Sequence, residues 1–343
     1  MKQLNMGIAG LGRLGMEHAR NIAWHIPGCK LKAICAKTEK TLAAGKMEFG
    51  DVAAYTSFDE MLKNDEIQAV AIVSPSGLHC EQIEKALDAG KHVFCEKPLG
   101  VSAEQCLQAE KAAQQHPELV CMLGFMRRYD PSYIYAKQKI LSGQIGTPYL
   151  FKGTAMDPES AIEGCIRYSD SSSGIFLDLA VHDIDLIRWY LGSEIAEVHA
   201  MGTTFKYPQL RAKGDDETGI AVFRMENGAL AMLHVGRSAP HGYHIETEIL
   251  GTKGSVRISP VPEKNLAMLY TGQGVVKECI EDFPQRFAQA YLEEMREFVS
   301  CVLEGRKPSV TLHDGTMSAV AALATKQSWQ TGEIVKLSYP AFD

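Results

Sequence analysis

The stretch that decides the fold is Leu4–Gly15, which reads LNMGIAGLGRLG. Leu4–Ala9 is an apolar run, and a helical pattern from Met16 to Trp24 follows the glycines. A strand, a Gly-x-Gly-x-x-Gly loop and a helix are the arrangement that binds a dinucleotide pyrophosphate on the free N–H groups of the helix start. The first glycine allows the turn, the second lets the backbone approach the phosphates, and the third lets helix pack on strand. The predicted loop comprises Gly10, Leu11, Gly12, Arg13, Leu14 and Gly15.

Strand-like and helical patterns alternate along residues 1–124, which we predict to be a dinucleotide-binding Rossmann domain. Apolar runs at Lys30–Cys35, Ile67–Val73, Val93–Cys95 and Leu119–Leu123 predict strands, with helices between them. The alternation predicts a parallel, doubly wound sheet with right-handed crossovers. Ligands of such sheets bind at the carboxyl ends of the strands. Further cofactor-binding residues are therefore expected among those that follow strands: Ser74, Pro75, His79, Glu96 and Lys97.

The end of the second strand bears on the choice between NAD and NADP. NAD-binding folds usually place an acid there to hold the ribose 2′-hydroxyl, but this chain has Ala36, Lys37 and Thr38. A missing acid, a hydroxyl and the cations Lys37 and Arg13 suit a 2′-phosphate. We therefore predict NADP. The alternative is that both cations are solvated and that other contacts hold NAD.

The segment Val93–Gly100, VFCEKPLG, joins an apolar strand end to an acid, a base and a proline. Pro98 fixes its own φ and biases Lys97 away from helix, so Lys97 is expected on a stiff turn. Charged groups at the carboxyl end of a parallel strand lie where these sheets bind ligands. A solvated Glu–Lys pair before a turn is the alternative interpretation.

Residues 125–343 are predicted to form an α+β substrate-binding and oligomerisation domain with a large, open, mainly antiparallel sheet. Candidate strands begin at Tyr149–Gly153 and recur to Val275–Glu278, separated by turns such as Asn227-Gly228. An open sheet face often pairs with a copy of itself, so we expect a homo-oligomer, a dimer or a tetramer. Arg127, after a strand end, and the polar segment Arg237–Tyr243 are candidates for contact with substrate.

The segment Ile175–Leu191 reads as one largely apolar helix that carries Asp178 and His182. Residues four apart share a helix face, and Asp185 continues that face. Most such pairs lie on surfaces, but a buried acid needs a partner. An acid beside a histidine raises its basicity and orients its ring, which suits a general base.

Composition restricts the function. The chain has 343 residues and a net charge of −7, which argues against nucleic acid or an anionic membrane as a main partner. Its apolar runs are shorter than the ~18–20 residues that span a bilayer, and the start has no signal-peptide core. We therefore expect a cytoplasmic protein. Nine cysteines without metal-ligand spacing predict reduced thiols, no disulfide and no metal site.

Together these segments resemble the glucose–fructose oxidoreductase, inositol dehydrogenase and MocA (Gfo/Idh/MocA) family, and most closely its inositol 2-dehydrogenase branch. The resemblance rests on the glycine loop, Glu96-Lys97-Pro98, the Gly124–Asp130 segment GFMRRYD, and Asp178 with His182. It implies an NAD(P)-dependent dehydrogenase that interconverts a cyclic polyol, myo- or scyllo-inositol, and its ketone, an inosose.

The resemblance also implies roles for residues. Lys97, Asp178 and His182 match the family's catalytic set, and the Lys97–Pro98 bond is expected to be cis. Glu96 is expected to face the nicotinamide ribose. The positions expected near the polyol are Arg127, Asp157, Asp178, His182, His241 and Tyr243. The chain departs from the common NAD pattern at Ala36, where many members carry an acid.

Two alternatives to an inositol dehydrogenase remain open. The first is a sugar or sugar-acid dehydrogenase of the same family, with a different pocket wall. The second is a non-catalytic, dinucleotide-sensing regulator, which we would expect to have lost Lys97 or His182.

Overall fold

Residues 3–339 are described by the computed structural model, except for the side chains of 170–172. By contacts the chain forms two compact units. The first unit comprises Met1–Tyr129 and Gln289–Ala319, and the second unit comprises Asp130–Ala288 and Val320–Asp343. The predicted boundary between a dinucleotide-binding domain and a substrate-binding domain, at residues 124 and 125, concerns function and stays a prediction. By contacts, the chain leaves the first unit after Tyr129 and returns to it at Gln289, which the sequence did not indicate.

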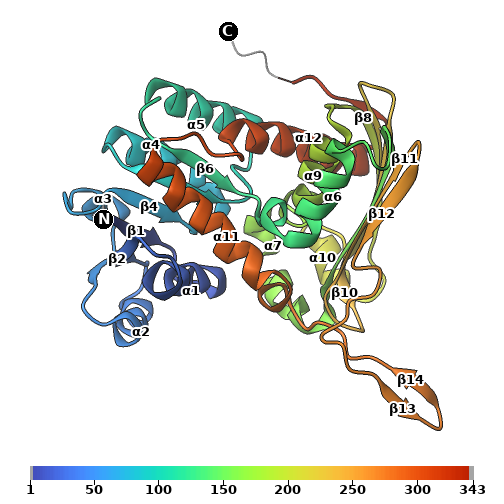
Figure 1. The fold of residues 1–343 in the computed structure, drawn as a ribbon, viewed down its shortest axis with the longest axis horizontal. Coiled ribbons are helices and arrows are strands. Elements are labelled where there is room, and N and C mark those ends of the chain that lie inside the picture. The colour runs from blue at the N-terminus through green and yellow to red at the C-terminus, as the bar shows by residue number, and fades with distance from the viewer. Residues whose placement is uncertain (1–2, 340–343) are drawn as a thin grey trace. The chain divides into compact units, whose positions relative to one another are not determined.

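The first unit contains a six-stranded sheet in the order β3-β2-β1-β4-β5-β6, and every pairing is parallel (Figure 1). This order confirms the predicted doubly wound sheet. All four residues of β4 are buried apolar side chains, as a strand covered on both faces requires. The strands are β1 (Leu4–Ala9), β2 (Cys29–Cys35), β3 (Ala53–Tyr55), β4 (Ala69–Ile72), β5 (His92–Glu96) and β6 (Cys121–Gly124).

Helices connect these strands, and side-chain caps start several of them. Thr38, Ser57 and Ser102 each accept a hydrogen bond from the backbone N–H three residues ahead, which satisfies an unpaired donor of the helix start. The helical elements before residue 130 are α1 (Arg13–Arg20), the π-helical η1 (Asn21–His25), α2 (Glu39–Phe49), α3 (Phe58–Leu62), η2 (Ser76–Leu78), α4 (His79–Asp88), α5 (Ala103–Gln115) and η3 (Met126–Tyr129).

The second unit contains a seven-stranded sheet in the order β12-β11-β7-β10-β9-β8-β15. Its pairings are antiparallel except for β7 with β10, so the predicted mainly antiparallel sheet is confirmed. The strands are β7 (Pro148–Pro158), β8 (Ile195–Thr203), β9 (Thr218–Met225), β10 (Leu230–Ala239), β11 (His244–Gly251), β12 (Gly254–Ile258) and β15 (Val335–Lys336); β13 (Leu269–Thr271) and β14 (Gly274–Val276) form a separate hairpin.

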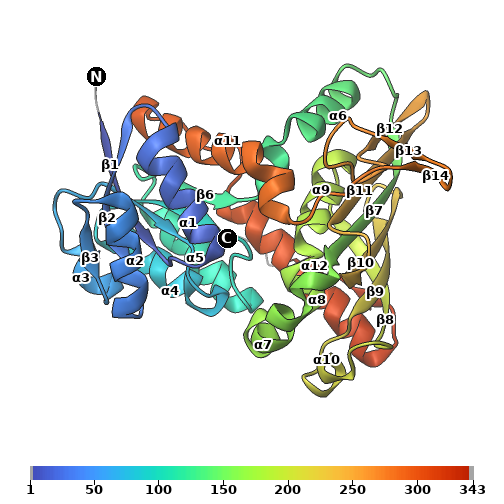
Figure 2. The ribbon, with the colours of Figure 1, turned by 90° about the horizontal axis from the view of Figure 1, so that it is seen from below.

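Helices of the second unit cover one face of this sheet, with α9 against β7 and α6 near β12 (Figure 2). The long helices α11 and α12 each contribute residues to both units. Among the described residues, no helix is both long and apolar enough to cross a membrane. The remaining helices are α6 (Pro131–Leu141), η4 (Glu159–Ala161), α7 (Ile162–Ser172), α8 (Ile175–Asp178), α9 (Val181–Leu191), α10 (Pro208–Ala212), α11 (Phe283–Glu304) and α12 (Leu312–Thr331).

The helix predicted over Ile175–Leu191 is two helices, so the expectation that one helix face carries both Asp178 and His182 is wrong. The N–H of Ala180 bonds the carbonyl of Ile175, which closes α8 with a wider turn, and α9 starts at Val181. Leu179 and Ala180 are both buried. The apolar pattern therefore continues across the break and gives no sign of it.

Candidate active site

The three glycines of the loop have three different surroundings. Gly10 has a φ of 97°, and a Cβ there would lie 2.2 Å from the carbonyl oxygen of Val73. A Cβ on Gly15 would lie 2.0 Å from the carbonyl oxygen of Gly10. A Cβ on Gly12, at the start of α1, would meet nothing within 4 Å. Two glycines are thus required by packing, and the open space at the third fits a dinucleotide pyrophosphate.

The residues after β2 lie at the edge where a dinucleotide fold binds the adenosine ribose. Ala36 is buried, and its N–H donates to the carbonyl of Tyr55 at 3.1 Å. Lys37 is exposed. The hydroxyl of Thr38 accepts a bond from the N–H of Thr41 and so caps α2. Thr38 therefore has a structural role that the sequence analysis did not include.

His79 joins the turn after β4 to the turn after β5. The imidazole is buried, with Nδ1 2.8 Å from the carbonyl oxygen of Pro98 and Nε2 2.8 Å from that of Ser74. Burial lowers the pKa of His79. The Ser74 hydroxyl donates to Gln82 at 2.5 Å. These contacts fix the backbone around Ser74 and Pro75. That Ser74, Pro75 and His79 contact the cofactor stays a prediction.

Glu96 ends β5 and is buried, whereas Lys97 is half-buried. The N–H of Lys97 donates to Glu96 Oε2 at 3.2 Å. The Lys97–Pro98 peptide bond is cis, which confirms what the resemblance implied. The acid and the amine that the sequence placed at a strand end therefore lie at the carboxyl end of β5, a parallel strand paired on both sides.

In the second unit, Asp178 lies against a buried arginine. Arg237 is 2% exposed and lies near the end of β10; its Nη1 lies 3.2 Å from Asp178 Oδ2. Its Nη2 lies 3.5 Å from Asp215 Oδ2, and its Nη1 lies 3.9 Å from Asp157 Oδ2. Burial alone would lower the pKa of Arg237, but the charges of Asp178 and Asp215 outweigh it and raise that pKa. Arg237 is therefore a fixed, buried cation with three carboxylates around its guanidinium.

A second donor reaches Asp178 from α7. The hydroxyl of Tyr168 donates to Asp178 Oδ2 at 3.0 Å, and the charge of Asp178 raises the pKa of this tyrosine. His182 is the second residue of α9 and is buried. Asp178 is therefore held by two donors, and the buried His182 follows it by four residues, on the next helix.

The other residues predicted to bind substrate have varied surroundings. Asp157 lies on β7 beside Arg237. Tyr243 is buried, packs edge-on against Phe287, and donates its N–H to the carbonyl of Ile280 at 2.8 Å. His241 Nε2 lies 3.1 Å from the Nδ1 of His244. Asp157 and Asp178 thus share a partner, and the roles of His241 and Tyr243 stay predictions.

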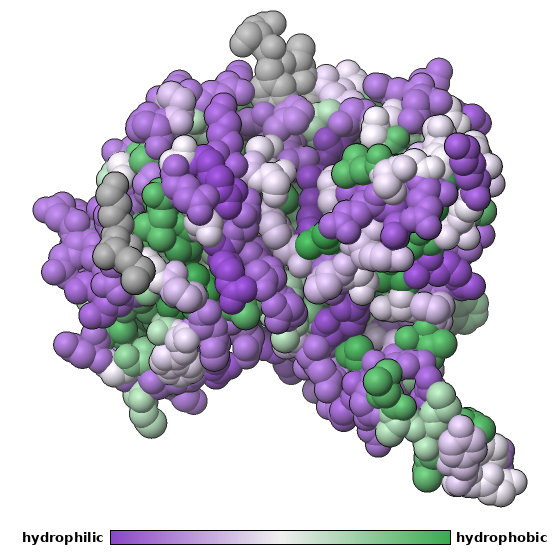
Figure 3. Space-filling view, in the orientation of Figure 1, coloured by the Kyte–Doolittle hydropathy of each residue, from purple (hydrophilic) through white to green (hydrophobic). Residues whose placement is uncertain are grey.

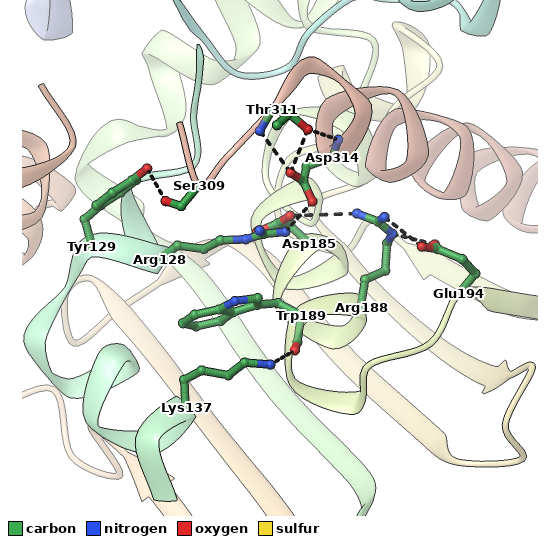
Figure 4. A network of polar contacts seen from close by, with 10 residues as sticks. All are labelled: Arg128, Tyr129, Lys137, Asp185, Arg188, Trp189, Glu194, Ser309, Thr311 and Asp314. Atoms are coloured by element: carbon green, nitrogen blue, oxygen red, sulfur yellow. Dashed lines mark hydrogen bonds and ion pairs between the residues drawn. The ribbon is translucent and has the colours of Figure 1, made fainter. Parts of the chain in front are cut away.

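Arg127 and Arg128 lie on η3, after β6. Arg127 is buried at 1% exposure, whereas Arg128 donates to Asp314 Oδ1 at 2.9 Å (Figure 4). Figure 4 also shows a polar group of the second unit, in which Arg188 binds Glu194 and lies 4.0 Å from Asp185. The sequence analysis placed Asp185 on the same helix face as Asp178. In the structure Asp185 is buried and lies beside Arg188 of its own helix.

Sequence reasoning missed Arg237 as the centre of a charge cluster, because it placed this residue in a loop between strands. The structure instead continues β10 through Ala239. Asp215 and Tyr168 were not predicted to belong to the site. Alternation of buried and exposed residues along β10 would have placed Arg237 on the inner side of the strand. Nothing in the sequence indicates its carboxylate partners.

Comparison with known proteins matches both parts of the chain to family models. Residues 4–125 match the model described as "Oxidoreductase family, NAD-binding Rossmann fold", and residues 133–257 match "GFO/IDH/MocA C-terminal domain". The chain is 33% identical over 335 residues to scyllo-inositol 2-dehydrogenase (NAD(+)) of Bacillus subtilis (strain 168), covering 98% of this chain and 96% of the relative.

Solved structures are similar over the whole length. A scyllo-inositol dehydrogenase from Lactobacillus casei, solved with bound cofactor NAD(H) and scyllo-inositol, is 44% identical with a TM-score of 0.95, covering 98% of this chain and 99% of that chain. A myo-inositol 2-dehydrogenase from Lactobacillus plantarum is 39% identical with a TM-score of 0.96, covering 98% and 100%.

Proposed function

The chain belongs to the Gfo/Idh/MocA oxidoreductase family, and we propose that it oxidises a cyclic polyol, myo- or scyllo-inositol, to the matching inosose. The observation that carries this proposal is the likeness, over nearly the full length of both chains, to a dehydrogenase solved with NAD(H) and scyllo-inositol. The open glycine loop supports a dinucleotide cofactor, and the Asp178–Arg237 cluster supports a charged, ordered site in the second unit.

The proposed mechanism uses Lys97, Asp178 and His182. His182 accepts the hydroxyl proton of the secondary alcohol while hydride leaves the same carbon. The Lys97 ammonium donates a hydrogen bond to that oxygen and stabilises its developing negative charge. Asp178 orients the imidazole and stabilises its protonated form. When bound, the nicotinamide supplies the hydride-accepting chemistry.

A substrate screen tests the proposed function. Purified protein is incubated with myo-inositol, scyllo-inositol or a panel of sugars, each with NAD and with NADP, and the absorbance of the reduced nicotinamide is followed. We expect an inositol to give the highest kcat/KM. A sugar or sugar-acid as the best substrate would favour the alternative dehydrogenase, and cofactor binding without any turnover would favour the regulator. The cytoplasmic location stays a prediction.

For the cofactor, the residues after β2 support the use of NADP: they include an exposed cation, Lys37, and no acid. Replacing Ala36 with Asp tests this, because a carboxylate there repels a 2′-phosphate and can bind a 2′-hydroxyl. We expect Ala36→Asp to lower kcat/KM for NADP by about 100-fold and to raise it for NAD. Lys37→Ala should weaken NADP binding, whereas Lys40→Ala, which changes the exposed second residue of α2, serves as the matched control. Equal loss with both cofactors in Ala36→Asp would contradict the proposal.

Self-association through the large sheet is supported by an apolar outer face. On β9, Ile220 and Val222 are 52% and 50% exposed while their strand neighbours are buried. Val222 pairs with Met232 of β10 and Ile220 with Met201 of β8, both exposed. Figure 3 shows further apolar surface on the β13–β14 hairpin, where Leu269, Tyr270, Val275 and Val276 are exposed. Contiguous apolar patches of this kind mark interaction sites.

A charged substitution on this face tests self-association. We expect Val222→Glu to convert a dimer or tetramer into a smaller species, because burying an unpaired carboxylate in an interface is unfavourable. Sedimentation velocity measures the change. The control is Arg224→Glu, on the same exposed face of β9, at a position that already carries a charge. A wild-type protein that sediments as a monomer, or a Val222→Glu protein that keeps the wild-type mass, would contradict the proposal.

A further inference from the structure

A buried histidine, His18, contacts Glu96, the acid at the end of β5. His18, on α1, lies with its Nε2 2.6 Å from Glu96 Oε1 and 3.9 Å from Glu294 Oε1 on α11. The three side chains are 0%, 3% and 0% exposed, and all belong to the first unit. From this geometry we infer that His18 is a positioning residue, which holds the Glu96 carboxylate in the orientation needed to bind the nicotinamide cofactor.

The surroundings of His18 leave its ring little freedom. Phe94 and Tyr291 pack edge-on against the imidazole, with ring centroids 5.2 and 5.6 Å away. His18 lies three residues after Gly15, so the helix that begins at the glycine loop also carries the partner of Glu96. The histidine therefore ties α1, the helix that begins in the glycine loop, to the carboxyl end of β5, and the cofactor is expected to bind at that loop and at that strand end.

Glu96 is constrained from its other sides as well. Its Oε2 accepts the N–H of Lys97, and a Cβ on Gly124 of β6 would lie 3.3 Å from its Cδ and Oε1. The absence of a side chain at Gly124 thus leaves the space that the carboxyl group fills. With Oε1 bonded to His18, the orientation of the group is determined by three neighbours, of which His18 makes the shortest contact.

Glu294 is the remaining polar group beside His18. Burial, with the charge of Glu96 added, raises its pKa well above the usual value, which favours the protonated carboxyl group. The direct hydrogen bond of this cluster joins the His18 imidazole and the carboxyl group of Glu96. The same residue types could also bind a divalent cation, since their ligand atoms lie within 4.8 Å of one another. The 2.6 Å contact between the imidazole and Glu96 favours the direct bond.

This inference rests on the proposed function, because it requires a bound nicotinamide cofactor; the contact of Glu96 with the nicotinamide ribose is the one that the family resemblance implies. A double-mutant cycle on cofactor binding tests it, with dissociation constants from nicotinamide fluorescence for wild type, Glu96→Gln, His18→Leu and the double variant. We expect each single variant to bind about 10- to 100-fold more weakly, and the double variant to bind no more weakly than the worse single one. His18→Gln, which keeps an N–H donor, should restore most of the affinity. Additive losses in the double variant, or wild-type affinity in His18→Leu, would overturn the inference.

Two measurements on the free protein separate this inference from the proposed function. A low-field imidazole N–H resonance of His18 is expected in the wild type and is expected to vanish in Glu96→Gln, whether or not any polyol is oxidised. His25 is an exposed histidine at the end of η1, which continues from α1. His25→Leu is therefore the matched control for His18→Leu, both in the cofactor titration and in the NMR measurement. Absence of that resonance, or a stoichiometric metal ion in the purified protein by elemental analysis, would overturn the inference.

Discussion

Replacing His182 with alanine is expected to lower kcat by about 10²–10⁴-fold and to leave cofactor affinity essentially unchanged. The proposed role of His182 is to take the hydroxyl proton, and positioned proton transfer contributes a rate factor of this size. The residue lies at the start of α9 in the second unit, outside the glycine loop and the residues after β2, β4 and β5. Steady-state kinetics and a cofactor titration measure the two effects separately.

The control for this prediction is His116→Ala, a part-exposed histidine of the first unit whose neighbours are Asp88 and Glu118. It should retain wild-type turnover. Circular dichroism verifies that the His182 variant is folded, since the side chain is buried. A folded His182→Ala protein with wild-type kcat would exclude His182 as the general base.

Replacing Arg237 with methionine is expected to destabilise the protein by about 3–5 kcal/mol and to reduce turnover strongly. Methionine has a similar length but no charge, so Asp178 and Asp215 lose their shared cation. Removing one partner of a buried ion pair has this cost because the other charge stays buried without compensation. Asp178 would then lose its neighbouring cation and would no longer be fixed in place to stabilise the protonated form of His182. Urea unfolding and kcat measure the two consequences.

The matched control is Arg224→Met, the same substitution on the neighbouring strand β9, where the arginine pairs with Glu197 on the surface at 2.9 Å. Exposed pairs of this kind contribute about 0–1 kcal/mol. Arg237→Lys keeps the charge but loses the fork that spans two carboxylates, so its stability should lie between wild type and Arg237→Met. Equal unfolding midpoints for the Arg224 and Arg237 methionine variants would show that the cluster does not stabilise the fold.

Much of the first unit could be predicted from the sequence because its signals are local. The apolar runs predicted at Leu4–Ala9, Lys30–Cys35 and Ile67–Val73 each overlap the strand that the structure has there. The apolar runs of a parallel sheet are continuous, so β1, β2 and β4 were evident without any knowledge of their order. Gly10 and Gly15 were evident from spacing alone.

What the sequence could not show depends on residues far apart in the chain. Arg237 meets Asp178, 59 positions away, and His18 meets Glu96, 78 positions away. No period or spacing connects such pairs. The break between α8 and α9 was missed for a different reason: buried apolar residues continue through Leu179 and Ala180, so composition is the same on both sides. The return of Gln289–Ala319 to the first unit likewise has no local signal.

The measurement that tests the central claim most directly follows the hydride itself. Inositol carrying deuterium on the carbon that is oxidised is incubated with the protein and oxidised nicotinamide, and the reduced cofactor is analysed by mass spectrometry and proton NMR. Direct transfer predicts that the label appears on nicotinamide C4, with one deuterium for each molecule of inosose formed, and that His182→Ala slows this transfer. Reduced cofactor without the label, or inosose formed without any reduced cofactor, would contradict the account.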